Sequence, residues 1–468
     1  MRGMTLRAIA EACNGVYYGS EDNLDKEVTD ITTDSRKVQN GGLFVAICGE
    51  RTDGHQYIDN CFNGGALCVI SEKELEGQTN SYIKVKSSLQ ALKDMALLYR
   101  NNLDIKVVGI TGSVGKTSTK ETISYVLNKK YKVLKTEGNF NNEIGLPLTV
   151  FRLRDDDEVA VLEMGISDFG EMDRLSKIAQ PDISVITNIG LCHLENLKTR
   201  DGILKAKTEI FNNMKPDGIA ILNGDDDKLI TVDEVNGKKP ERFGINYKDG
   251  VYAKDIENLG LSGTKFVISG LNCVDGCKDF EVTVPVPGHH MIYNALAAAC
   301  VGAALELTSA QIADGIADLK TISGRNNIIK TSKYTLIDDC YNANPVSMKA
   351  SVDVLDMAIG RKVCILGNMY ELGENEKNLH YDVGQYIGTK NIDVLITIGD
   401  LARHIAMGTD DYMETHFGSY DCEIHSFDDM EEFNMAYSSI LKDNDNILIK
   451  ASHAMKFADI VELLSKDN

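Results

Sequence analysis

The chain has 468 residues, and 70 acidic against 49 basic side chains give it a formal net charge of −21. A chain of this length predicts two to four domains. The charge excludes nucleic acid and anionic membranes as expected partners, because phosphate groups repel so negative a protein. No apolar run approaches a membrane span, the N-terminus lacks the layout of a secretory signal, and the eleven cysteines have no paired spacing. We therefore expect a cytoplasmic protein.

Short β-branched segments predict a small α/β domain over residues 1–103. Strands are expected at 43–47, 67–70 and 82–85, where apolar and β-branched residues run together. A helical pattern over 89–103 closes this domain.

Strands alternate with helices over residues 104–323, which predicts a central domain. The apolar segments that predict its strands are 107–111, 159–164, 183–188 and 219–222. This alternation is typical of a parallel sheet that helices cover on both faces. Residues 250–286 are rich in glycine and alternate in polarity, so we expect antiparallel strands there.

The same alternation returns over residues 324–468. The expected strands are 335–338, 362–366, 394–398 and 446–449. They predict a second, smaller doubly wound domain of Rossmann-like type. The expected fold class is therefore α/β with three domains.

A phosphate-binding turn follows strand 107–111. The turn and the start of the next helix comprise Thr111, Gly112, Ser113, Val114, Gly115, Lys116, Thr117 and Ser118. Glycines let backbone N–H groups converge on phosphate, the helix dipole favours negative charge, and Lys116 can reach the outer phosphates. A hydroxyl at Thr117 or Ser118 would complete the shell of a Mg²⁺ ion. A glycine-rich turn with a chance lysine is the alternative, and the strand–turn–helix context disfavours it.

Polar residues at later strand ends are further site candidates, because ligands bind beyond the carboxyl ends of parallel strands. Glu163 ends an apolar strand and could hold Mg²⁺, although it could equally be a solvated carboxylate. His193 follows strand 183–188, where a structural role is the common one, but its place beside the phosphate turn favours a metal role. Asn294 lies in the first turn of an alanine-rich helix and could contact an adenine edge or simply pack in the core.

The tight spacing of the phosphate turn resembles that of the Mur ligase and folylpolyglutamate synthetase superfamily, whose members make amide bonds with ATP. Nearly the whole chain is similar to Mur ligases. The matching segments are 111–118, 137–147, 163–165, 187–190 with His193, 205–207, 290–294, 338–345 and 367–373 with His380. Tyr-Asn-Ala-Asn-Pro at 341–345 and Asn-Phe-Asn-Asn-Glu-Ile-Gly-Leu-Pro at 139–147 are the most discriminating. They resemble the branch that joins D-alanyl-D-alanine to a UDP-N-acetylmuramoyl-tripeptide.

The resemblance implies a catalytic set of Lys116, His193 and Lys207. Residues 111–118 would cradle ATP, with Lys116 on the β- and γ-phosphate oxygens. Of two Mg²⁺ ions, Thr117 and Glu163 would bind one, and His193 would help to bind the other. Lys207 is similar to the family lysine that CO₂ carbamylates, which would make it an acidic metal ligand; Lys205 is the nearby competitor.

The resemblance also implies contacts for the nucleotide and the substrates. Asn294 would contact adenine, Arg325 the γ-phosphate, and either Asp338 or Asp339 the ribose. The implied substrate-binding residues are Ser35 and Arg36, in a segment similar to the uridine-diphosphate site, together with Asn141, Asn142, Asn342 and Asn344. The implied domain roles are UDP-substrate binding by 1–103, ATP binding by 104–323 and binding of the incoming amine by 324–468.

Two segments depart from the family pattern. Gly-His-His-Met at 288–291 stands where Gly-Lys-His-Asn is common, and Lys-Ala-Ser-His at 450–453 replaces Lys-Gly-Ser-Arg. An imidazole at His453 is a weaker, pH-dependent substitute for a guanidinium.

The implied reaction proceeds through an acyl-phosphate intermediate. We expect the enzyme to be a monomer. A nucleotide switch would need a guanine-reading Asn-Lys-x-Asp, which the sequence lacks, and a non-catalytic module would be expected to lack Lys116, Glu163 or His193. The sister ligase that adds the third residue would read more like Asp-Tyr-Ala-His within 339–345. Whether that third residue is meso-diaminopimelate or L-lysine stays open, as does the strictness for D-alanyl-D-alanine.

Overall fold

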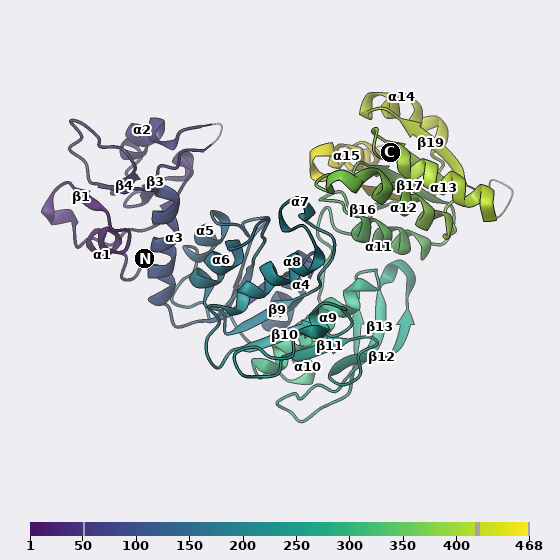
Figure 1. Cartoon of the computed structure of the whole chain (residues 1–468), viewed down its shortest axis with the longest axis horizontal. Helices are drawn as coiled ribbons and strands as arrows, with labels where there is room; N and C mark the ends of the chain where they lie inside the picture. The colour runs from purple at the N-terminus through teal and green to yellow at the C-terminus, as the bar shows by residue number, and fades with distance from the viewer. Residues whose placement is uncertain (50–51, 417–421, 467–468) are drawn as a thin grey trace.

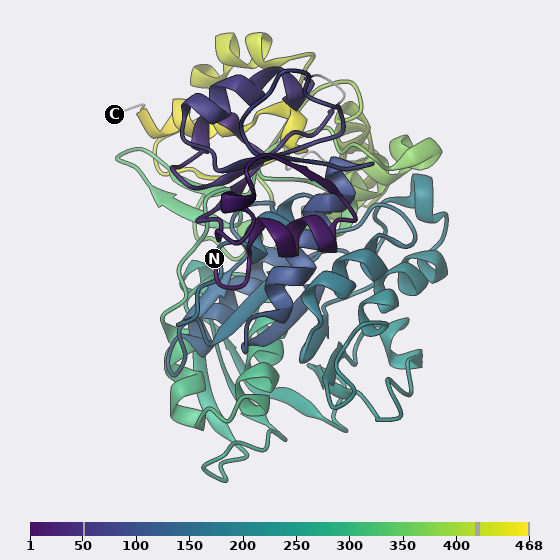
Figure 2. The same ribbon diagram turned by 90° about the vertical axis from the view of Figure 1, so that its left-hand side faces the viewer.

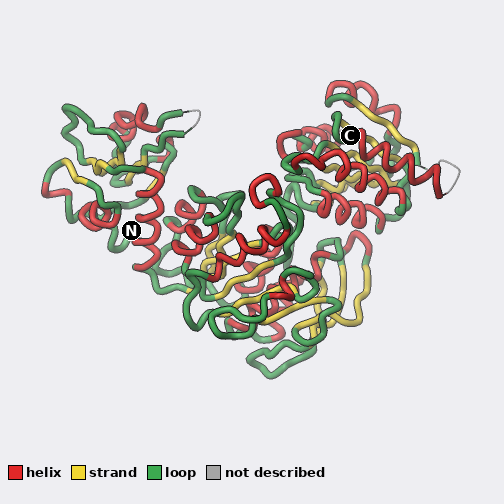
Figure 3. The backbone as a smooth tube through the Cα atoms, in the orientation of Figure 1, coloured by secondary structure: helices red, strands yellow, loops and turns green. Residues whose placement is uncertain are grey.

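The computed structural model describes residues 1–49, 52–416 and 422–466. It contains three α/β units, each built on its own sheet (Figure 1). The N-terminal and C-terminal units lie on the same side of the middle unit (Figure 2), and helices surround the strands of each sheet (Figure 3). Within the described ranges, no helix is both long and apolar enough to cross a membrane.

The N-terminal unit has a five-stranded sheet of order β1-β5-β4-β3-β2, in which only β1 is antiparallel. The strands are β1 (Val16–Tyr18), β2 (Ile31–Thr32), β3 (Leu43–Val45), β4 (Cys68–Ser71) and β5 (Tyr82–Lys84). The helices are α1 (Leu6–Ala12), α2 (Ile58–Asn63) and α3 (Ser88–Asn101). The predicted strands and closing helix are present, while the short β1 and β2 were not predicted.

Helix α3 joins the N-terminal unit to the middle unit through packing as well as sequence. Its buried face, including Met95 and Tyr99, belongs to one core cluster that continues into the middle unit. The Tyr99 hydroxyl donates to the carbonyl of Leu153 at 2.7 Å, and the Arg100 guanidinium donates to the carbonyl of Ala179 at 3.2 Å. The two units therefore share a hydrophobic core.

The middle unit has a nine-stranded sheet of order β14-β13-β12-β11-β10-β9-β6-β8-β7. The strands are β6 (Lys106–Thr111), β7 (Val133–Lys135), β8 (Val159–Glu163), β9 (Ile183–Ile186), β10 (Ile219–Asn223), β11 (Glu241–Gly244), β12 (Val251–Asn258), β13 (Thr264–Ser269) and β14 (Phe280–Val284). The strands from β7 to β12 are parallel, and β12, β13 and β14 pair antiparallel, as the sequence predicted.

Helices cover both faces of the middle sheet. The helices of this unit are α4 (Lys116–Leu127), α5 (Gly145–Val150), α6 (Glu171–Ala179), α7 (Leu194–Leu197), α8 (Arg200–Thr208), α9 (His290–Ala304) and α10 (Ser309–Ala317). One apolar cluster holds α3, α5, α6 and α8 against the sheet, and a second holds α4, α9 and α10. Four alanines of α9, Ala295 and Ala297 to Ala299, are buried, which allows close packing on α4 and the strands.

The C-terminal unit has a six-stranded sheet of order β15-β16-β20-β17-β18-β19, with β15 antiparallel. The strands are β15 (Asn327–Lys330), β16 (Thr335–Asp338), β17 (Lys362–Gly367), β18 (Val394–Ile398), β19 (Glu423–Phe427) and β20 (Asn446–Lys450). The helices are α11 (Pro345–Asp356), α12 (Glu376–Gly388), α13 (Arg403–His416), α14 (Met430–Ile440) and α15 (Ala458–Lys466). The four predicted strands are present. The expected boundaries at 103/104 and 323/324 stay predictions.

Candidate active site

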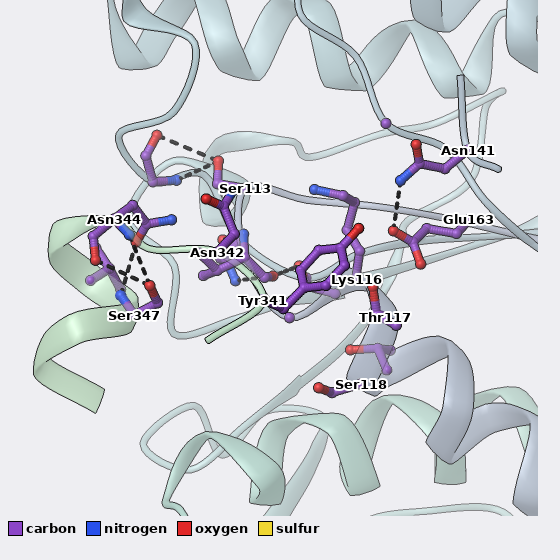
Figure 4. Close-up of a pocket in the computed structure, with 18 of the residues that line it drawn as sticks. Ser113, Lys116, Thr117, Ser118, Asn141, Glu163, Tyr341, Asn342, Asn344 and Ser347 are labelled. Carbon is purple, nitrogen blue, oxygen red and sulfur yellow. Dashed lines mark hydrogen bonds between the residues drawn. The ribbon is translucent and has the colours of Figure 1, made fainter. Parts of the chain in front are cut away.

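A cavity of about 1150 Å³ lies between the middle and C-terminal units. Its middle-unit wall is formed by the phosphate turn and by segments that follow β8, β9 and β10. Its other wall comes from residues 324–326, 339–351 and Lys450. Figure 4 shows Lys116, Thr117 and Glu163 near Tyr341 and Asn342 of the C-terminal unit. The cavity therefore occupies the place where parallel sheets bind ligands.

The phosphate turn depends on two glycines with positive φ. Gly112 has φ +154° and Gly115, the N-cap of α4, has φ +81°. A Cβ at Gly112 would lie 1.9 Å from the Thr187 hydroxyl oxygen. The first backbone bond of the helix joins the N–H of Thr119 to the carbonyl of Gly115 at 2.8 Å, so earlier N–H groups have no partner within the helix. These donors, with the Lys116 ammonium, suit an anion.

Asn188, just after β9, holds the turn in shape. Its side-chain oxygen accepts from the N–H of Val114 at 3.0 Å, and its side-chain nitrogen donates to the carbonyl of Val114 at 2.9 Å. The Thr187 hydroxyl donates to the same carbonyl at 2.7 Å. In this structure the Lys116 ammonium donates to the carbonyl of Gly112 at 2.9 Å. The turn is thus preorganised by the neighbouring strand end.

Glu163 presents an unsatisfied oxygen in the cavity wall. The side chain is buried, and its Oε1 accepts from the Asn141 amide at 2.9 Å (Figure 4). Its Oε2 has no hydrogen-bond partner among the described residues. The Lys120 ammonium lies 3.8 Å from Oε2 and donates to the carbonyl of Thr136 at 2.7 Å. A buried carboxylate oxygen that accepts no hydrogen bond is costly even with an ammonium group nearby, which suits a position that receives a further cation.

Lys207 and Lys205, two residues apart on α8, have opposite environments. Lys207 is 1% exposed, whereas Lys205 is exposed with its ammonium 5.9 Å from the Phe169 ring centre. Burial, with a smaller contribution from the Lys116 ammonium, lowers the pKa of Lys207 to about 7. Lys207 does not itself line the cavity but acts on cavity residues through its charge.

His193 lines the cavity after β9. Burial is the main cause that lowers the pKa of its imidazole, and the ammonium groups of Lys207 and Lys116 add to the effect. A neutral imidazole is the form that binds metal ions. Among the described residues, no three His, Cys, Asp or Glu side chains are grouped to hold a metal by themselves.

The predicted nucleotide contacts fall in different places. Asn294 and Arg325 line the cavity, and the Arg325 guanidinium lies 4.3 Å from the centre of the Tyr341 ring. The Asn294 side-chain oxygen already accepts from the Thr119 hydroxyl at 2.9 Å. Its side-chain nitrogen also has a partner within α9, so its amide is anchored to α4 and α9.

Asp338 is the last residue of β16 and Asp339 follows it, and of the two only Asp339 lines the cavity. Its Oδ2 accepts from the Lys450 ammonium at 2.5 Å, and its Oδ1 accepts from the N–H of Asn326 at 3.1 Å. Asp338 instead accepts from the N–H of Gly324 at 2.7 Å and so holds the connection between the two units. The carboxylate of Asp338 therefore accepts a hydrogen bond from the backbone, a role that the sequence analysis did not predict.

The predicted substrate residues divide into two groups. Asn141, Asn142, Asn342 and Asn344 all line the cavity. Asn344 also caps α11 by accepting from the N–H of Ser347 at 2.8 Å. Ser35 and Arg36 lie in the N-terminal unit and are not among the residues that line this cavity, and the Arg36 guanidinium pairs with the Asp34 carboxylate at 2.9 Å. The structure thus provides two separate candidate regions.

Family models match three successive parts of the chain. They are a Mur ligase family catalytic domain over 27–100, a Mur ligase middle domain over 110–302 and a Mur ligase glutamate ligase domain over 324–453. The UDP-N-acetylmuramoyl-tripeptide–D-alanyl-D-alanine ligase of Bacillus subtilis is 35% identical over 98% of this chain and 97% of its own length. The Escherichia coli ligase of that name is 33% identical over 100% and 99%. The chain belongs to the Mur ligase family.

Solved structures agree with this assignment to the Mur ligases. MurF from Acinetobacter baumannii superposes with a TM-score of 0.88 at 29% identity, covering 99% of each chain. MurF from Thermotoga maritima, solved in complex with ADP, superposes with a TM-score of 0.81 at 31% identity, covering 94% of this chain and 97% of its own. The predicted three-domain α/β fold and family are thereby confirmed.

Two residues that line the cavity, Asn188 and Lys450, were missed by the sequence reasoning, as was Lys120, which lies next to Glu163 without lining the cavity. Asn188 ends a predicted strand beside the phosphate turn, so its position was a usable signal. Lys450 was noted only as part of a divergent segment, and Lys120 was given no role. Both lysines are buried, and their hydrogen-bond partners, the Thr136 carbonyl for Lys120 and Asp339 for Lys450, come from other elements, so no local pattern identifies them.

Replacing Gly112 with alanine is expected to lower the affinity of the phosphate turn for ADP at least about tenfold. The new Cβ would meet the Thr187 hydroxyl, and the backbone would be strained at φ +154°. Gly237→Ala is the matched control, because Gly237 also has positive φ but has nothing within 4 Å of the added atom. Calorimetric titration with ADP measures both variants. Equal affinities would show that the turn tolerates a side chain.

Proposed function

We propose that this chain uses ATP to join D-alanyl-D-alanine to the terminal carboxylate of a UDP-N-acetylmuramoyl-tripeptide. The product would be the UDP-linked pentapeptide of peptidoglycan synthesis. One observation carries the proposal: the phosphate turn, Glu163 with an oxygen that accepts no hydrogen bond, and residues 341–344 line the same cavity. The full-length relatives that carry this activity in their names support it.

The reaction that fits this cavity has two steps. In the first, an oxygen of the tripeptide carboxylate attacks the γ-phosphorus of ATP, so that ADP leaves and an acyl phosphate forms. In the second, the amine of D-alanyl-D-alanine attacks the acyl carbon, phosphate leaves, and the amine proton is lost. Negative charge develops in both steps. The Lys116 ammonium and the N–H groups that open α4 can stabilise that charge, and Arg325 can contact the outer phosphate.

The residues present suit two Mg²⁺ ions alongside the nucleotide. The Oε2 of Glu163, which accepts no hydrogen bond, and the hydroxyl of Thr117 would hold one ion. His193 in the cavity wall would contribute to the other, together with a modified Lys207, whose charge acts on His193. Magnesium commonly takes one or two protein carboxylates and completes its shell with water and phosphate, so a larger protein cluster is not needed. When bound, the ions would neutralise phosphate charge.

Lys207 suits carbamylation because its amine is neutral for much of the time near pH 7. The neutral nitrogen attacks CO₂, a C–N bond forms, and one proton is released to leave a carbamate anion. The modification removes a buried cation beside Lys116 and creates oxygen ligands in its place. Lys205 is exposed and therefore lacks the burial that lowers the pKa of Lys207.

The three units suit three tasks. Residues 1–103 would bind the UDP end through Ser35 and Arg36, 104–323 would bind ATP, and 324–468 would bring the amine. We propose that the enzyme acts as a monomer, because one chain supplies both walls of the cavity. A cytoplasmic location is consistent with substrates that are nucleotides.

The decisive assay measures phosphate release from ATP with UDP-linked tripeptide and different amine donors. We expect D-alanyl-D-alanine to support turnover at least about tenfold better than D-alanine or L-lysine, since the C-terminal unit would bind the whole dipeptide. A preference for L-lysine with a UDP-linked dipeptide would instead assign the chain to the sister ligases. Comparing tripeptides ending in L-lysine and meso-diaminopimelate in the same assay settles the third residue.

Replacing Lys116 with alanine should reduce kcat about 10²- to 10³-fold, because charge that develops on the transferred phosphate loses its ammonium partner. Lys177→Ala, on an exposed position of α6, is the control and should keep normal turnover. The phosphate-release assay compares the two. Near-normal turnover of the Lys116 variant would contradict the nucleotide assignment.

Carbamylation should be visible by ¹³C NMR of protein equilibrated with labelled bicarbonate. A carbamate signal is expected to grow as pH rises from about 6 to 8, because the lowered pKa of Lys207 makes the amine neutral over that range. Lys207→Ala should lose the signal and most activity, with partial rescue by formate or acetate, whereas Lys205→Ala should keep both. The reverse pattern would identify Lys205 as the modified residue.

A further inference from the structure

The loop that follows β9 is bonded to the phosphate turn. The N–H of Gly190 donates to the Ser113 hydroxyl at 2.9 Å, and the N–H of Ser113 donates to the carbonyl of Asn188 at 3.0 Å. Asn188 and Thr187 are also bonded to Val114, as described above. Any change in this loop is therefore transmitted to groups that face the ATP phosphates.

The same loop contacts the C-terminal unit. Leu191 packs against the apolar cluster of that unit, whose members include Met369 and Leu372. Two residues later, the Nδ1 atom of His193 lies 3.7 Å from the Oε2 atom of Glu371. Leu191 and His193 belong to the middle unit, and Glu371 belongs to the segment between β17 and α12. The loop is thus held between the phosphate turn and the C-terminal unit.

Backbone conformation marks both ends of this contact. His193 has φ +50° and Glu371 has φ +62°. Residues other than glycine rarely adopt this left-handed backbone region. Such conformations persist where the surroundings fix them, and they concentrate at functional sites. Of the charged groups acting on His193, Lys207 and Lys116 are cationic and Glu371 is anionic. Glu371 is therefore the carboxylate that can orient the imidazole from the C-terminal side.

We propose that Glu371 is a positioning residue for His193, so that docking of the C-terminal unit completes the ATP site of the middle unit. This inference rests on the proposed function. Glu371 lies in the Gly-Asn-Met-Tyr-Glu-Leu-Gly segment at 367–373, to which the reaction assigns no other task. The unit that brings the amine would also fix the histidine, so ATP chemistry would be favoured only when the acceptor unit is in place.

A double-mutant cycle tests the link. Glu371→Gln keeps the size of the side chain and removes its charge, and Glu374→Gln removes an exposed charge three residues away as the control. Because the Glu371 side chain is 72% exposed, its loss is expected to lower kcat about three- to fivefold, with little change in KM for ATP. In a His193→Gln background, Glu371→Gln should cost nothing more. If His193→Gln has no measurable turnover, the cycle uses hydrogen exchange of the Asn196 and Leu197 N–H groups, which Glu371→Gln should not accelerate further in that background.

Hydrogen exchange of the ligand-free enzyme gives a reading that does not depend on catalysis. The N–H groups of Asn196 and Leu197 donate to the carbonyl of His193 at 3.2 and 3.0 Å. Peptides that carry them should exchange about threefold faster in Glu371→Gln than in the unsubstituted protein, and at the unsubstituted rate in Glu374→Gln.

The proposal requires both a coupled loss and faster exchange. It is overturned if Glu371→Gln lowers kcat equally in both backgrounds, lowers it in neither, or leaves exchange unchanged. If the unsubstituted enzyme makes no product from D-alanyl-D-alanine, the proposed function fails, and the exchange comparison then decides the role of Glu371 alone.

Discussion

Holding a polyanion in a protein of net charge −21 is the constraint on which the site depends. The long-range field opposes ATP, so favourable potential has to be created locally. The N-terminus of α4, the Lys116 ammonium and the Arg325 guanidinium provide it within one cavity. Burial lowers the pKa of both Lys207 and His193, so these two side chains carry less positive charge near neutral pH than they would in water.

The connection between the middle and C-terminal units is fixed by buried charge rather than by apolar packing alone. Asp338 accepts from the N–H of Gly324, and Asp339 accepts from the N–H of Asn326 while pairing with the buried Lys450. Burial makes these bonds costly to break one at a time. Residues 324–326 are therefore anchored to the end of β16, and this keeps Arg325 on the cavity wall.

Much of the fold was predictable, because its central strands are apolar runs and its phosphate turn is a local pattern. The elements that were missed are short or lie toward sheet edges: β7 has three residues, and β19 is an edge strand with exposed positions. The roles of adjacent residues could not be predicted for a different reason. Asp338 and Asp339 lie side by side in sequence but have different partners, and only the tertiary structure separates the residue that bonds to the connection from the residue that lines the cavity. The approach of Glu371 to His193 joins segments distant in sequence, so no local pattern could reveal it.

Helix α3 has a consequence for how the substrate is presented. The apolar core around α3 continues into the middle unit, and Tyr99 and Arg100 donate hydrogen bonds to backbone carbonyls of that unit. The N-terminal unit is therefore packed against the middle unit and not joined to it by a flexible linker alone. A ligand anchored in the N-terminal unit would meet the phosphate turn across a separation set by rigid packing. The enzyme would then select its substrate by length: the end of a peptide that is one residue too short would not reach the reacting phosphate, whatever the chemistry of its end group.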